Sequence, residues 1–150
     1  MKKTLITFLT LITTLSNAEN LKYILLPGTV IDTTIQWGAD CKTDFPNEPI
    51  YVMGIVSRNV HDFASFTNTL IPAGAFALGK IKTNGKVCEG IKWEKISLIR
   101  DNYAQEISLQ NSYTQIDSKK SIEPGQEVQI LMYDKVDFQV IKTIQLNTTN

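Results

Sequence analysis

The amino-acid sequence predicts an all-β fold: a single small β-barrel, or a barrel-like sandwich, of about seven to nine short strands with one disulfide. Three observations lead to this prediction. Apolar and polar residues alternate with a period of two along most of the chain, corners of proline and glycine recur before such runs, and two cysteines lie far apart. Residues 57–70 alone hint at a helix, and there we expect a loop with at most a short turn.

The first eighteen residues are typical of a cleavable signal peptide. Two lysines precede an apolar stretch of twelve residues, and Ser16-Asn17-Ala18 then supplies small residues for cleavage before Glu19. Twelve helical residues rise about 18 Å, short of a bilayer core of roughly 30 Å, so an uncleaved anchor is only the alternative. We expect residues 1–18 to be the signal and residues 19–150 to form one exported β-barrel domain without a spanning segment.

The charge balance of this domain points away from polyanionic partners. Without Lys2 and Lys3, the 15 basic side chains of the chain fall to 13, against 15 acidic ones. The resulting net charge of −2 does not favour nucleic acid or an anionic membrane surface. We therefore expect neither as a partner.

Cys41 and Cys88 are the two cysteines of the chain, and both lie in the exported part. Thiols in an oxidising compartment usually pair, and closing a loop of about fifty residues would stabilise the fold by roughly 4 kcal/mol. Two cysteines with the single histidine, His61, make a poor zinc set. We predict a structural disulfide and no metal site.

The alternating runs define the expected strands. Residues 30–37 place Ile31, Thr33, Ile35 and Trp37 on one face. Residues 51–60 form the next strand, in which Gly54 indicates a bulge or a close approach of another chain segment.

The strongest hairpin signal is Asn84-Gly85, which suits a type I′ turn between residues 75–82 and 87–99. The first of these strands has a face of small residues, which indicates tight packing. In the second strand the apolar residues change face, which indicates a bulge. A further strand follows at residues 103–110, and the polar residues 111–121 are expected to form a loop.

Three corners precede strands, namely Pro27-Gly28, Pro72-Ala73-Gly74 and Pro124-Gly125. Proline at the second position of a turn fixes φ, and a following glycine adopts the positive φ that other residues resist. We interpret the corners as architectural, and expect them to lie on one rim of the barrel.

No catalytic apparatus is evident in the sequence. The sequence shows no nucleophile, base and orienting acid at a recognisable spacing. His61 and Asp62 are adjacent, so in an extended segment their side chains would point to opposite faces. We predict no catalytic residue and no cofactor. Two other functions stay open: a carbohydrate site that uses Trp37 or Trp93 as a stacking platform, and a hydrolase built on paired carboxylates.

The order of corners and strands resembles the carboxy-terminal barrel of the VirB/TrbI-type scaffold proteins of conjugation and type IV secretion machines. LLPGTVIDTTI (residues 25–35) resembles the opening strand of that family, IKWEKISLI (91–99) its tryptophan strand, and IEPGQEVQILMYDKVDF (122–138) its closing strand. Residues 51–81 resemble the intervening strand–loop segment. The positions that carry the resemblance are Pro27, Gly28, Leu70, Ile71, Pro72, Gly74, Leu78, Gly79, Trp93, Pro124, Gly125, Asp137 and Phe138.

The resemblance covers the barrel alone, because the inner-membrane helix and the pore-forming helical hairpin of the family have no counterpart here. It implies a non-catalytic periplasmic scaffold or accessory subunit of an envelope complex. Such a subunit would pack against other subunits, with a homo-oligomeric ring as one arrangement. We predict Ile35 and Trp37, on the alternating opening strand, as interface residues.

Overall fold

The computed structural model describes residues 19–62, 66, 68–100 and 102–142, so the predicted signal peptide lies outside the described residues. Within them the chain forms strands and no helix, which confirms the all-β prediction. The strands are β1 (Glu19–Leu25), β2 (Val30–Trp37), β3 (Ala39–Asp40), β4 (Tyr51–Val56), β5 (Val60–His61), β6 (Thr69–Ile71), β7 (Phe76–Thr83), β8 (Cys88–Arg100), β9 (Tyr103–Lys119), β10 (Ser121–Ile122), β11 (Glu127–Met132) and β12 (Val136–Lys142).

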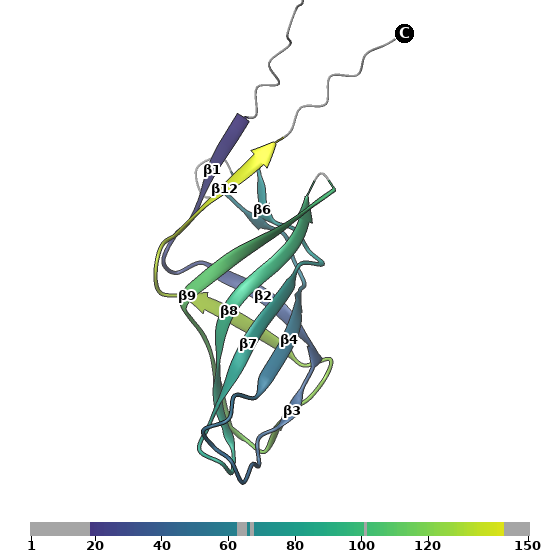
Figure 1. The fold of residues 1–150 in the computed structure, drawn as a ribbon, viewed down its shortest axis with the longest axis vertical. Coiled ribbons are helices and arrows are strands. Elements are labelled where there is room, and N and C mark those ends of the chain that lie inside the picture. Colours follow the sequence, from purple (N-terminus) through teal and green to yellow (C-terminus); the bar gives the residue numbers. More distant parts are fainter. Residues whose placement is uncertain (1–18, 63–65, 67, 101, 143–150) are drawn as a thin grey trace, which may run out of the picture.

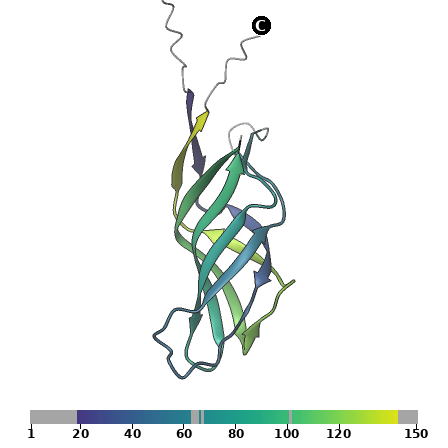
Figure 2. The same ribbon diagram turned by 45° about the vertical axis from the view of Figure 1, so that its right-hand side comes forward.

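Six strands close into an antiparallel barrel in the order β11-β2-β4-β7-β8-β9. This number is below the seven to nine expected, because the other strands pair outside the barrel as β1–β12, β3–β10 and β5–β6. The β1–β12 ribbon extends beyond one end of the barrel, and β3 lies toward the other end (Figures 1 and 2). Residues 57–70, expected to be a loop, contribute the short β5–β6 pair.

In β2 the side chains follow the predicted alternation as far as Ile35. Ile31, Thr33 and Ile35 are buried, as expected for one inward face. Trp37 does not share that face and is 71% exposed. The pairing of β2 with β4 shifts between Ile35 and Trp37, so that Gln36 is an extra residue and the alternation changes side.

Trp93 fills the centre of the barrel. It is fully buried, and its Nε1 donates a hydrogen bond to Thr114 Oγ1 at 2.9 Å. Gly54 and Gly79 both border the indole, because a Cβ atom at Gly79 would lie 3.0 Å from Trp93 Cε3 and one at Gly54 would lie 3.4 Å from Trp93 Cη2. The nearest obstacles are Thr33 Cγ2, 2.4 Å from such an atom at Gly54, and Ile91 Cγ2, 2.7 Å from one at Gly79. The tight packing at the small inward face of β7 and the close approach at Gly54 are thus confirmed, and Trp93 is one of the side chains involved.

The β7–β8 hairpin is confirmed, although its turn differs from the prediction. Thr83 pairs with Cys88, so the loop holds four residues, and Gly85 has a positive φ of 89° while Asn84 is not among the residues with positive φ. Asn84 Oδ1 instead accepts hydrogen bonds from the amides of Lys86 and Val87. The expected bulge in β8 occurs between Trp93 and Lys95.

The predicted loop at residues 111–121 is wrong, because β9 continues to Lys119. Ser112, Thr114 and Ile116 point inward and alternate with exposed residues, which is a strand pattern built largely from polar side chains. These hydroxyls are satisfied inside the barrel: Ser112 donates to the carbonyl of Gln110, and Thr114 to that of Gln129. At these two positions of β9, hydrogen bonding therefore replaces apolar burial.

The three corners are turns with the same construction. In each, glycine occupies the third position with a positive φ between 84° and 93°, as predicted. Pro27 and Pro124 occupy the second position, whereas Pro72 occupies the first.

Each corner forms two backbone hydrogen bonds with one buried residue of a neighbouring strand. The amide of Gly28 donates to the carbonyl of Met132, and the amide of Met132 donates to the carbonyl of Thr29. The corner at Gly74 is bonded to Val56, and the corner at Gly125 to Ile35, in the same way.

The expectation of a single rim is wrong. The corners at Gly28 and Gly74 begin β2 and β7, which run in the same direction, whereas the corner at Gly125 begins β11, which is antiparallel to β2. Two corners therefore lie at one end of the barrel and the third at the other end.

Cys41 and Cys88 form the predicted disulfide, with their Cα atoms 5.2 Å apart. It joins the segment after β3 to the first residue of β8, and both cysteines are fully buried. A structural disulfide is typical of an oxidising compartment outside the cytoplasm.

Candidate functional site

A group of apolar side chains faces outward on β2, β4 and β7. We name it the apolar wall, and it consists of Trp37, Tyr51, Met53, Ile55, Phe76 and Leu78. Trp37 is 71% exposed, and Tyr51 and Phe76 are each 48% exposed. The other members are half-buried. Large apolar groups gathered on a surface, in contrast to scattered ones, mark interaction sites.

The strand register makes the apolar wall continuous. Met53 lies between Trp37 of β2 and Leu78 of β7, and Ile55 lies opposite Phe76. Directly opposed residues of antiparallel strands project from the same face of a sheet and lie close together. The bulge at Gln36 is what brings Trp37 to this face, so an irregularity in β2 completes the apolar wall.

Ion pairs border the apolar wall on the β8 side. Lys80 Nζ lies 2.7 Å from Glu94 Oε1 and 5.4 Å from the centroid of the Tyr51 ring. The hydrogen bond to Glu94 raises the pKa of Lys80 above its ordinary value. Further round, Lys95 Nζ lies 2.8 Å from Glu106 Oε1, and this hydrogen bond lowers the pKa of Glu106. An apolar centre with a charged border is the usual anatomy of a protein–protein interface.

The two predicted interface residues differ in position. Trp37 belongs to the apolar wall, whereas Ile35 is fully buried in the core and bonded to the corner at Gly125. The structure therefore gives no support to Ile35 as a contact for a partner. Of the tryptophans considered for sugar stacking, Trp93 is enclosed in the barrel and offers no face to a ligand.

The remaining residues of the resemblance lie in the corners or in strands. Asp137 and Phe138 are in β12, opposite Ile24 and Tyr23 of β1. The corner residues and Gly79 have the structural positions described above.

Sequence reasoning did not identify Tyr51, Met53 and Phe76 as candidate contacts. Their signal was present in the alternating runs, because β4 and β7 carry apolar residues at outward as well as inward positions. A strand with two apolar faces has one face that the core of its own barrel does not bury.

The described residues hold no group of three or more His, Cys, Asp or Glu side chains that could bind a metal ion. In the same part of the chain no helix is long and apolar enough to cross a membrane. His61, the one histidine of the sequence, is exposed on β5. Glu94, a carboxylate of β8, is paired with Lys80.

No protein-family model matches this sequence, and a search of curated proteins finds no match either. The functional assignment consequently depends on the residues and the geometry of the chain itself.

Proposed function

We propose that this protein is a non-catalytic scaffold or accessory subunit of a bacterial conjugation or type IV secretion envelope complex, acting in the periplasm by packing against neighbouring subunits. The contact surface is the apolar wall, and the neighbours are other subunits of the complex, including further copies of this chain in a ring. The observation that carries the proposal is the exposure of Trp37 beside Met53 and Leu78.

Energetic considerations support packing as the activity. Tryptophan and tyrosine are the side chains that most often dominate binding at interfaces, when apolar neighbours exclude water around them. Trp37 and Tyr51 stand at one end of the apolar wall, and the Lys80–Glu94 pair supplies a polar border. The resemblance to the VirB/TrbI-type barrel suggests the same mode of action, lateral packing of barrels. The disulfide agrees with a periplasmic location.

The test is the replacement Trp37→Glu, measured by size-exclusion chromatography with light scattering, alone and with envelope-complex subunits. We expect assembly to weaken by at least about 2 kcal/mol, because a charge replaces the most exposed aromatic side chain of the apolar wall. The monomer should remain folded, since Trp37 contributes little to the core. Gln115→Glu, an exposed position on β9, is the matched control and should assemble normally. Assembly of Trp37→Glu at the wild-type level would refute the proposal.

A soluble carbohydrate-binding domain is the alternative function. The burial of Trp93 removes one of the two aromatic platforms considered for it, so any sugar site on this barrel must use other aromatic residues.

A further inference from the structure

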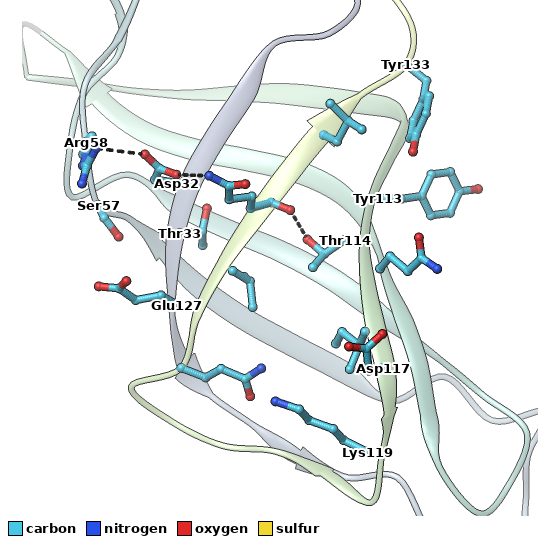
Figure 3. A pocket seen from close by; sticks show the side chains of 16 residues that line it. Asp32, Thr33, Ser57, Arg58, Tyr113, Thr114, Asp117, Lys119, Glu127 and Tyr133 are labelled. Carbon is cyan, nitrogen blue, oxygen red and sulfur yellow. Dashed lines mark hydrogen bonds and ion pairs between the residues drawn. The ribbon is translucent and has the colours of Figure 1, made fainter.

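The barrel is least completely closed between β9 and β11. These strands pair over only Leu131–Tyr113 and Met132–Ser112, after which they separate. The separation leaves a groove of about 760 Å³ that runs from β9 across β11 and β2 to the segment after β4 (Figure 3). This volume lies within the range of small-molecule sites. We name it the polar groove.

The side chains of the polar groove are hydrogen-bonding groups of both kinds. Planar amides and carboxylates predominate, and the principal ones are Asp32, Gln115, Asp117, Glu127 and Gln129. Three carboxylates and two cations, Arg58 and Lys119, line the groove, which leaves a formal charge of −1. A nearly neutral set of donors and acceptors favours a neutral, polyhydroxylated ligand over a phosphate or a metal ion.

The left part of the groove in Figure 3 is held in place by its own contacts. Gln129 Nε2 donates to Asp32 Oδ1 at 2.9 Å, and Asp32 Oδ2 lies 3.7 Å from Arg58 Nη1. The backbone carbonyl of Gln129 accepts a hydrogen bond of 2.6 Å from Thr114 Oγ1. The hydrogen bond between Gln129 and Asp32 orients these two side chains before a ligand arrives, which lowers the entropic cost of binding, whereas the ion pair with the exposed Arg58 contributes little.

Two tyrosines supply an aromatic surface at the upper end of the groove. Tyr113 and Tyr133 meet edge to face with their ring centroids 6.1 Å apart, and they are 36% and 53% exposed (Figure 3). The electron-rich face of an aromatic ring attracts the positively polarised C–H groups of a sugar ring. Tyrosine faces beside amides and carboxylates are thus a suitable lining for a pyranose.

An added peptide strand fits the polar groove less well. Strand addition requires free backbone groups along a sheet edge. The carbonyl of Gln129, in the middle of β11, is already bonded to Thr114. A peptide would have to displace this bond and leave the buried Thr114 hydroxyl, which also accepts from Trp93 Nε1, without its acceptor.

We propose that the polar groove binds a neutral oligosaccharide segment, with a sugar ring on Tyr113 and Tyr133 and its hydroxyls bonded to Gln115, Asp117 and Gln129. This function adds to packing through the apolar wall and does not depend on it, because the two surfaces share only β2.

The experiment uses the exported chain with residues 19–150 and its disulfide intact. Its backbone amides are followed by NMR during titration with tetraoses of N-acetylglucosamine, glucose (β-1,4 and α-1,4 linked) and mannose, and with an extended alanine–threonine pentapeptide. At least one tetraose should shift the amides of residues 113–117 and 127–133. Trp37→Phe leaves Trp93 as the single tryptophan, so its fluorescence reports the same binding through Thr114.

The variants Tyr113→Ala and Gln115→Ala should each weaken binding about tenfold or more, corresponding to about 1.4 kcal/mol. Both residues are on the surface, and thermal unfolding verifies that each variant is folded. Tyr51→Ala, on the apolar wall, is the matched control and should bind like the wild type. The inference is overturned if no tetraose shifts these amides, if the shifts lie on the apolar wall, or if the pentapeptide alone occupies the groove. Assembly of Tyr113→Ala is measured in parallel, so failure here is distinguishable from failure of the packing proposal.

Discussion

The apolar wall and the polar groove lie on opposite sides of the barrel, and they use one strand alternation for different chemistry. Around the ring, the β4–β7 pair is opposite the place where β9 meets β11. Outward positions on β4 and on the first half of β7 are apolar, with Lys80 and Lys82 following in β7, whereas those on β9 and β11 are mostly polar. The inward residues differ too, since β9 contributes Ser112 and Thr114 to the interior. Each side of the barrel therefore differs from the other in its inward residues as well as in its outward ones.

Trp93 connects the two sides, so its removal is the largest perturbation. Its ring packs on Gly54 and Gly79 beneath the apolar wall, and its Nε1 is bonded to Thr114 beside the polar groove. Trp93→Ala should lower the free energy of unfolding by about 3–5 kcal/mol in urea titrations, because it opens a large cavity. Trp37→Ala, the exposed counterpart, should change stability by about 0.5 kcal/mol or less. Equal effects of the two substitutions would contradict a core centred on Trp93.

Thr114→Val perturbs only the side of the barrel that carries the polar groove. It should lower the free energy of unfolding by less than Trp93→Ala does. The valine has nearly the same shape but cannot accept the hydrogen bond from Trp93 Nε1 or donate to Gln129. A buried, unsatisfied donor costs about 1–3 kcal/mol. We expect urea unfolding to show a loss in this range.

The control for this substitution is Thr34→Val, where the hydroxyl lies on the exterior and contacts Ser57. It should change the free energy of unfolding by about 0.5 kcal/mol or less. If both substitutions have equally small effects, the groove side does not depend on the buried hydrogen bonds.

The smallest effect concerns pH and the border between the two sides. The hydrogen bond from Lys95 lowers the pKa of Glu106 below its ordinary value of 4.5. Because the folded-state pKa is depressed, the stabilisation is complete above pH 4.5 and is lost as the pH falls through the folded-state value. The melting temperatures of the wild type and Glu106→Gln should differ slightly at pH 7 and converge in acid. The difference should also shrink in high salt, since the pair is exposed. A difference in melting temperature that grows as the pH falls would contradict the expected stabilisation by the Lys95–Glu106 pair.

The sequence was sufficient to predict the parts of the fold that depend on local chemistry. The β7–β8 hairpin, the glycine corners and the disulfide follow from turn propensity, alternation and cysteine spacing. The second half of β9 differs from the predicted loop, because a run of polar residues is equally compatible with a loop and with a strand whose inward hydroxyls are hydrogen-bonded. In this barrel, the inward hydroxyls find backbone partners: Ser112 bonds to Gln110 of its own strand and Thr114 to Gln129 of β11.

The surfaces could be predicted only in part, because long-range contacts define them. Trp37 changes face at a bulge next to Ile35, and the corner at Gly125, which is remote in sequence, holds Ile35 in place. The polar groove exists because β9 and β11 pair over two positions only. Neither contact has a local signature in the sequence.

The corners at Gly28 and Gly125 have a mechanical consequence. One attaches the start of β2 to the end of β11, and the other attaches the start of β11 to the end of β2. The β2–β11 pair is therefore held by hydrogen bonds at both ends and forms one rigid side of the groove. The other side is β9, which pairs with β11 at two positions and contains Asn111 with a φ of 51°. Because β9 is also paired with β8 along most of its length, any adjustment of the width of the opening must involve the β8–β9 hairpin as a unit.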